Sequence, residues 1–170
     1  MKVRQPLRTS EVDFPRKALL SEDQAHVIAR LRRHSPALAN SLEQALKDLR
    51  DQTRVSYVGP AAEVREAMRA AVQLFAPDDE VREQTWFKGI TQGKKLNPTQ
   101  AERIRYAVQQ RGGSKDQANK TNDLIDQLIG EIGRETYSVG SSAVHAGTVR
   151  DKVRKLTGWA FMILDEILPE

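Results

Sequence analysis

The sequence contains no cysteine in its 170 residues. Disulfide bonds, thiolate nucleophiles and cysteine-bound zinc are therefore excluded, and an apolar core has to supply the stability. Long apolar runs are also missing. The densest run, from Trp159 to Leu164, is far too short to cross a bilayer, and no apolar signal-peptide region follows Met1. We therefore expect a cytoplasmic protein that does not associate with membranes.

Several familiar functional motifs are absent as well. The chain has no phosphate-binding glycine loop, no His-Glu-x-x-His zinc motif and no Gly-x-Ser-x-Gly elbow. We expect neither a metal ion nor another cofactor. A large excess of one charge is also lacking, because 27 Lys and Arg face 23 Asp and Glu, for a net charge of +4. This balance permits nucleic-acid binding without requiring it.

Helical periodicity, in contrast, is present from Ser21 to the end of the chain. Apolar residues recur at spacings of three and four, and capping boxes begin at Ser21 and Ser114. These signals predict an all-α protein, a compact bundle of about six to seven helices formed by residues 21–170 as a single domain. Residues 1–20 lack a sustained period and are expected to form an extended or partly disordered arm.

Helix boundaries follow from the same local signals. We expect one helix to start at Asn97-Pro98 and the last helix to start at Thr148. Before Asn97, the mixed pattern predicts a short helix at residues 79–84 and a Gly/Lys-rich loop at residues 89–95. The second half of the last helix, residues 159–164, is apolar nearly all round, which predicts a position at the centre of the bundle.

Polar chemistry concentrates in the segment Tyr137–Ala146. If the helix continues through this segment, Ser138, Ser141, Ser142 and His145 follow spacings of three and four and share one face. Two hydroxyls and an imidazole on one face could orient a phosphodiester and move a proton at neutral pH. A Gly-Ser-Ser-Ala run also suits a close helix–helix contact with His145 near its end, and spacing alone does not separate the two interpretations.

Basic residues are the second group of candidates. Four of them are candidate phosphate contacts because they lie in or just before one predicted helix: Arg103, Arg105, Lys94 and Lys95. A solvated charged face is the alternative. Arg134 is a further candidate, but eleven residues of helix place it about 16 Å from His145 along the axis. It would contact an extended RNA or DNA backbone or act across a dimer interface.

Aromatic residues and the remaining histidines call for simpler interpretations. Tyr57, Trp86 and Phe87 lie in predicted loops, where they could stack on bases. Aromatic residues in such positions more often close the ends of a bundle, which is the interpretation we favour. His26 and His34 lie in charged early helices and are expected to be ordinary surface residues.

Three stretches of the chain resemble one protein family. Residues 54–66, residues 99–106 and the segment Tyr137–Ala146 with the helix after it are similar to the predicted pPIWI-associating nuclease family, over roughly residues 40–168. Its members are small bacterial proteins, or domains, found in settings of conflict with phages and other mobile elements. The last third also resembles HEPN domains, helical bundles that commonly dimerise and act as metal-independent RNases. Ser142 and His145 are the residues that match the HEPN pattern best. The Arg that HEPN proteins place a few residues before the His is missing.

This resemblance implies a defence-associated nuclease or nuclease-like effector domain that acts on nucleic-acid phosphodiesters, with RNA favoured over DNA. His145 would be the general acid and base, and Ser141 and Ser142 would orient the phosphate or the attacking hydroxyl. The protein would form a homodimer or dock onto a larger defence effector. The alternative is a non-catalytic helical interaction or oligomerisation module of a larger bacterial defence complex. A third hypothesis is a nucleic-acid-binding regulator without catalysis.

Overall fold

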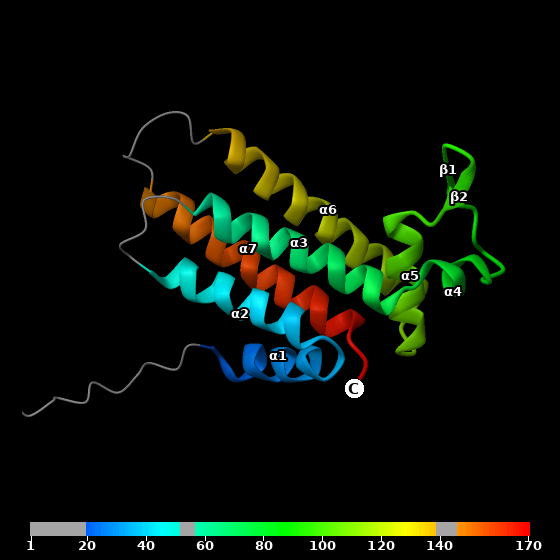
Figure 1. Cartoon of the computed structure of the whole chain (residues 1–170), viewed down its shortest axis with the longest axis horizontal. Coiled ribbons are helices and arrows are strands. Elements are labelled where there is room, and N and C mark those ends of the chain that lie inside the picture. The colour runs from blue at the N-terminus through cyan, green and yellow to red at the C-terminus, as the bar shows by residue number, and fades with distance from the viewer. Residues whose placement is uncertain (1–19, 52–56, 139–145) are drawn as a thin grey trace, which may run out of the picture.

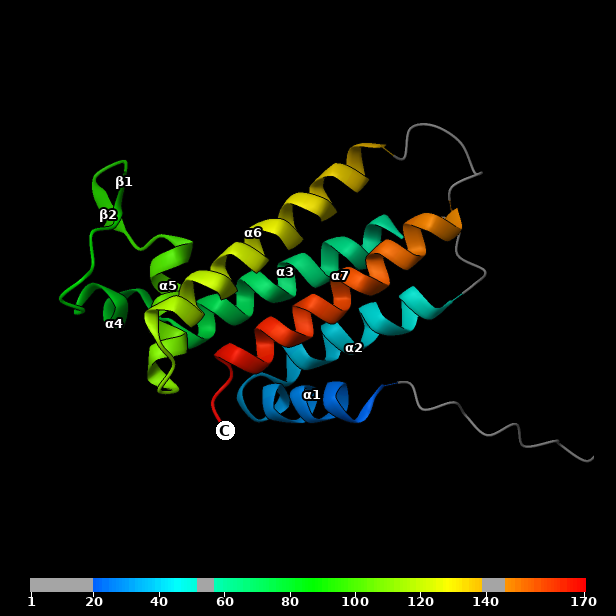
Figure 2. The same cartoon turned by 180° about the vertical axis from the view of Figure 1, so that it is seen from behind.

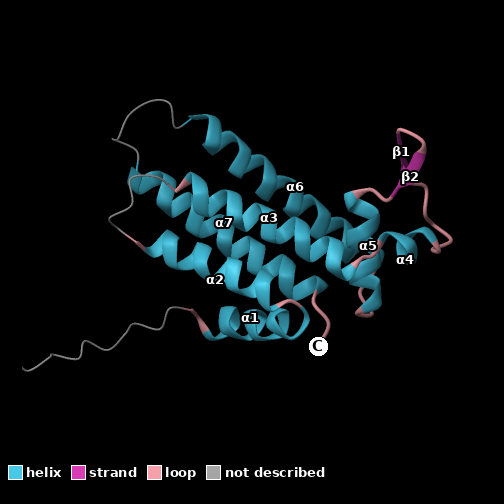
Figure 3. Ribbon diagram, viewed as in Figure 1, coloured by secondary structure: helices cyan, strands magenta, loops and turns pink. Residues whose placement is uncertain are grey.

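The computed structural model describes residues 20–51, 57–138 and 146–170, with the backbone alone at residues 50, 132–138 and 146–153. This part of the chain contains seven helices and one two-stranded hairpin (Figures 1 and 3). In chain order they are α1 (Glu22–His34), α2 (Pro36–Arg50), α3 (Val58–Phe75), α4 (Asp78–Arg82), β1 (Ile90–Gln92), β2 (Lys95–Asn97), α5 (Gln100–Gln110), α6 (Lys115–Ser138) and α7 (Ala146–Ile167). The prediction of a helical bundle is confirmed. The expected N-terminal arm lies outside the described residues except for Leu20.

Helix starts follow the capping signals of the sequence. At α1, the Ser21 side chain accepts from the Gln24 backbone, and the Gln24 side chain accepts from the Ser21 backbone. At α2, Ser35 caps the helix and Pro36 occupies its first turn. Gly112, with a φ of 79°, follows the end of α5 in the left-handed conformation that glycine adopts without strain.

Three predicted boundaries were wrong. The loop expected at residues 89–95 is largely an antiparallel hairpin that pairs Ile90 with Asn97 and Gln92 with Lys95. The helix expected to begin at Asn97-Pro98 is capped instead by Thr99, because Asn97 is held in β2. The last helix is already formed at Ala146, two residues before Thr148. The short helix expected at residues 79–84 is α4, shifted slightly toward the N-terminus.

The main core surrounds α7, which contacts α1, α2, α3, α5 and α6 (Figure 1). Burial of apolar side chains from all of these helices removes them from water and drives their association. The largest fully buried side chains are Leu31, Leu42, Leu49, Met68, Ile104, Ile125, Leu128, Ile163, Leu164, Ile167 and Leu168. The expected central position of the second half of α7 is therefore observed. One side of it nevertheless faces solvent, since Met162 is 62% exposed.

The two ends of the bundle differ. At one end, α4 and the hairpin extend beyond α5 and enclose a small separate apolar cluster formed by Ala76, Val81 and Tyr106, with Trp86 and Phe87 packed against it (Figure 2). At the other end of the bundle lie the last turn of α2, the first turn of α3 and the first turn of α7, with the last turn of α6 set apart from them. None of the helices in the described ranges has the length and apolar character needed to span a membrane.

A buried arginine joins the first helix to the end of the last. Arg30 is 2% exposed. Its guanidinium donates to Asp165 Oδ1 at 2.5 Å, to the Pro169 carbonyl at 3.1 Å and to the Leu168 carbonyl. These donors satisfy carbonyls that a helix C-terminus leaves unpaired, and the positive charge opposes the negative end of the helix dipole.

We predict that Arg30→Met lowers the free energy of unfolding by about 2–3 kcal/mol, because buried carbonyls lose charged hydrogen-bond donors. Urea denaturation followed by circular dichroism measures this loss. Arg33→Met is the matched control. Arg33 is exposed on the same helix, so its replacement should change stability by less than about 0.5 kcal/mol. Equal effects of the two substitutions would contradict a structural role for the buried guanidinium.

Candidate functional site

The candidate catalytic residues Ser141, Ser142 and His145 lie outside the described residues. Their predicted shared face therefore stays a prediction. Residues 139–145 join the last residue of α6, Ser138, to the first residue of α7, Ala146. Both anchor points lie at the end of the bundle away from the hairpin (Figure 1). Arg134 lies in the last turns of α6, four residues before Ser138.

Two further candidates for phosphate contact, Lys94 and Lys95, lie at the tip of the hairpin. They were expected in a loop. Gly93, with a φ of 64°, and Lys94 form the turn between the two strands. Both lysine side chains are exposed, and neither forms an ion pair within the described ranges. They are free to contact an anion.

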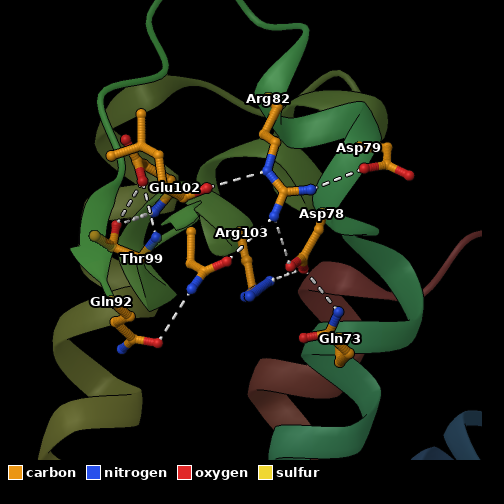
Figure 4. A network of polar contacts seen from close by, with 10 residues as sticks. Gln73, Asp78, Asp79, Arg82, Gln92, Thr99, Glu102 and Arg103 are labelled. Carbon is orange, nitrogen blue, oxygen red and sulfur yellow. Dashed lines mark hydrogen bonds and ion pairs between the residues drawn. The ribbon is translucent and has the colours of Figure 1, made fainter. Parts of the chain in front are cut away.

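Arg103 is placed differently from the two lysines. Its side chain is 15% exposed and donates to Asp78 Oδ1 at 2.5 Å. Arg82 reaches the other oxygen of Asp78 at 3.4 Å (Figure 4). Arg82 also donates to the Leu96 carbonyl and to the Asn97 side chain. The two arginines therefore tie α5 and β2 to the start of α4.

Arg105, on the other face of α5, packs against an aromatic ring. The centre of its guanidinium lies 4.2 Å from the centre of the Trp86 ring, a cation–π geometry. Its Nε is buried and has no hydrogen-bond partner among the residues that the structure describes. Trp86 thus belongs to the packing around the small cluster, and Tyr57 is 5% exposed in the main core. The favoured structural interpretation of these aromatic residues agrees with their positions.

Asp78 is held ionised by its neighbours. Gln73 donates to Asp78 Oδ1 at 2.9 Å, and Arg103 donates to the same oxygen (Figure 4). The Gln73 hydrogen bond and the arginine charges lower the pKa of Asp78 below 3.8, against the opposing effect of burial.

Glu102 has two structural functions, one within α5 and one toward the hairpin. Its Oε2 accepts from the Thr99 backbone at 2.8 Å and completes the capping box of α5. Its Oε1 accepts from the backbone N–H groups of Lys88 at 2.7 Å and Gly89 at 2.9 Å. Burial opposes ionisation, but the backbone hydrogen bonds from Gly89, Thr99 and Lys88 outweigh it and lower the pKa of Glu102. The Thr-x-x-Glu spacing was the available sequence signal, although it predicts the cap alone.

The backbone at Gly89 lies close to the side chains of Phe87 and Leu96. Its φ is 65°, and a Cβ atom there would lie 2.7 Å from the Phe87 ring and 2.8 Å from Leu96. Glycine is therefore required at the point where Glu102 holds the backbone. One turn further along α5, Tyr106 donates to Glu80. This hydrogen bond, with burial and the charges of Glu80 and Glu83, raises the pKa of Tyr106 to about 12.

Within the described ranges, no three His, Asp or Glu side chains are grouped so that they could hold a metal ion. His26 and His34 are both exposed, as expected. The ring of His34 meets Phe75 edge-on, with 5.2 Å between ring centres. The catalytic role of His145 and the independence from metal ions both stay predictions.

Residues 31–155 match the family described as predicted pPIWI-associating nuclease. The chain belongs to this family. The match begins in α1 and ends within α7, so it includes the hairpin, the polar network and residues 139–145. It starts earlier and ends earlier than the predicted range of 40–168. No curated protein and no solved structure matches the chain. The resemblance of the last third to HEPN domains stays a prediction.

For this predicted pPIWI-associating nuclease, we predict that Glu102→Gln destabilises the hairpin end by about 1–2 kcal/mol, because an amide oxygen replaces an ionised acceptor and one acceptor is lost. Since the folded pKa is below the unfolded value of 4.5, the stabilisation by Glu102 is complete above that pH and is lost as the pH falls through the folded pKa. The variant should therefore lose less stability than the wild type on acidification.

Hydrogen exchange at the Lys88 and Gly89 amides, with urea unfolding at several pH values, measures both effects. Glu83→Gln is the control, because Glu83 is exposed in the same part of the chain. Unchanged protection of the two amides in Glu102→Gln would show that this carboxylate does not hold the hairpin.

Proposed function

We propose that this chain is a defence-associated nuclease, or a nuclease-like effector domain, that acts on nucleic-acid phosphodiesters, with RNA favoured over DNA. The observation that carries the proposal is the family match over residues 31–155. That range includes the segment in which two serines and a histidine lie within five residues.

In this proposal His145 is the general acid and base, because an imidazole changes its charge near neutral pH. Ser141 and Ser142 orient the phosphate or the attacking hydroxyl. The topology is compatible with a site at this position, since residues 139–145 join α6 to α7 at the end of the bundle away from the hairpin (Figure 1). Arg134 lies one turn before the end of α6, near enough to contact the same nucleic-acid backbone.

We assign two different roles to the four basic residues of the hairpin end that were predicted to contact phosphate. Lys94 and Lys95 are the exposed ones, and we assign them to phosphate contact. Arg103 and Arg105 are engaged by Asp78 and Trp86, so they act mainly by holding the hairpin in place. The hairpin and the serine–histidine segment lie at opposite ends of α6. Its 24 residues span roughly 36 Å, so one nucleic acid that contacts both ends must be at least that long.

A non-catalytic docking module is the second candidate. The observation in its favour is the outward side of α7, where Met162 is 62% exposed and the half-buried Trp159 ring lies 5.2 Å from Lys155 Nζ. An exposed methionine beside an aromatic ring is typical of protein-binding surfaces. This face would serve a second copy of the chain or a larger defence effector.

We predict that His145→Ala lowers the cleavage rate on single-stranded RNA by about 10²–10⁴-fold, the usual contribution of general acid–base catalysis. Ser142→Ala should lower it by a smaller factor. Purified proteins are assayed on RNA and DNA of the same sequence, with and without a chelator. His26→Ala is the matched control, because His26 is exposed on α1 and lies before the matched range.

Cleavage by His145→Ala at the wild-type rate would remove His145 from the mechanism. Inactivity of the wild type on every substrate would favour the docking module instead. In that case Met162→Glu should abolish self-association or partner binding in sedimentation experiments, whereas His145→Ala should leave it unchanged.

A further inference from the structure

A cavity of about 200 Å³ opens between α3, α5 and α6. Its inner wall is apolar and consists of Met68 and Val72 from α3 and Ile125 and Ile129 from α6. Pockets for drug-sized ligands have roughly 300–1,000 Å³. The cavity therefore fits one ring system rather than a larger molecule.

Two glutamine side chains on the rim carry acceptors in fixed orientations. Gln73 donates through Nε2 to Asp78 at 2.9 Å, and Gln100 donates through Nε2 to Asp126 at 2.8 Å. Because a carboxylate only accepts hydrogen bonds, each contact fixes which end of the amide is Nε2. The Oε1 atom of each glutamine accepts no hydrogen bond from a described residue and is available to a ligand.

Two arginines supply donors on the same rim. Arg103 uses Nη1 for Asp78 and lies along the cavity wall. Arg69 is 57% exposed at the mouth, with its nearest carboxylate, Glu66, at 3.8 Å. The rim thus carries both acceptors and donors beside an apolar wall.

The charges around the cavity argue against a bare anion as the ligand. Arg69 and Arg103 are offset by Glu66, Asp78 and Asp126. A neutral, flat ring that has donors and acceptors on its edge is suited to apolar walls, glutamine acceptors and arginine donors together. A nucleobase has this chemistry.

We propose that the cavity between α3, α5 and α6 binds one nucleobase, either from single-stranded nucleic acid or from a free nucleotide. This inference rests on the proposed function and deepens it, because it gives the chain a contact with bases in addition to phosphates. Arg69, at the mouth, lies where the attached phosphate leaves the cavity. Ile129 precedes Ser138 by nine residues, about 14 Å of helix, so the cavity lies between the hairpin and the candidate catalytic segment.

The experiment compares a fluorescent 12-nucleotide RNA with an abasic strand of the same length, by fluorescence anisotropy. Gln100→Leu removes the acceptor on the rim without changing the size of the side chain much. Gln110→Leu is the matched control, because Gln110 is exposed on the same helix and does not line the cavity. Ile129→Phe is a second variant that fills the cavity without removing a polar contact, and thermal unfolding checks that each variant is folded.

We expect the wild type to bind the RNA more tightly than the abasic strand. Gln100→Leu and Ile129→Phe should each raise the Kd for RNA roughly tenfold and leave the Kd for the abasic strand unchanged. Gln110→Leu should behave as the wild type. AMP and CMP should shift NMR signals of the cavity residues in the wild type, whereas ribose 5-phosphate should not.

Equal affinity for the two strands in all proteins, with no NMR response to AMP or CMP, would overturn the base pocket and leave the proposed function standing, since phosphate contacts survive. If the protein binds no oligonucleotide but binds AMP in a Gln100-dependent manner, the pocket is supported with a free nucleotide as its ligand. The proposed action on nucleic acid would then be the part that fails.

Discussion

The buried guanidinium of Arg30 at the end of α7 is the contact on which the arrangement of the bundle depends. α7 is the helix that the other long helices surround, and its C-terminal carbonyls would be left without partners inside the protein. Arg30 from α1 and Arg111 from the end of α5 reach this point from different directions, and Arg111 also pairs with Glu170 at 2.8 Å. Two positive charges at a helix C-terminus are favoured by the helix dipole. The first, fifth and last helices are therefore joined in one place, at the end of α7 opposite the candidate catalytic segment.

A second group of charges organises the hairpin end. Asp78 and Glu102 are ionised acceptors that accept hydrogen bonds from α3, α4, α5 and the backbone before β1 (Figure 4). The arginines that pair with Asp78 are thereby used for structure, so the net charge of the chain overstates the positive surface available to a nucleic acid. The exposed lysines at the turn of the hairpin form a smaller basic surface. The hairpin that carries it is tied to α4 and α5 by hydrogen bonds from Arg82 and to Glu102.

The separation of these features along the molecule constrains the function. The basic turn, the cavity between α3, α5 and α6, and the end of α6 lie in that order along the bundle. An extended strand could follow α6 and meet all three, whereas a compact nucleotide would meet one. The same geometry is compatible with a pair of chains in which the hairpin of one lies near the candidate segment of the other. Under the proposed function, either arrangement would let a chain with little excess charge contact a nucleic acid at several points.

The helical class, the starts of α1 and α2 and the identity of the core face were predictable, because apolar periodicity and capping depend on residues three or four apart. The family was also predictable, since it rests on continuous motifs such as residues 54–66. The hairpin was not, because its two strands have only three residues each and are also held by hydrogen bonds from Arg82 and to Glu102, which are distant in sequence. The burial of Arg30 and the ion pair of Arg103 were equally hidden, as their partners lie 135 and 25 residues away. The sequence determines local hydrogen bonds, because their donors and acceptors are only a few residues apart. The environment of a charged side chain depends on which helices pack against it, and only the tertiary structure decides this.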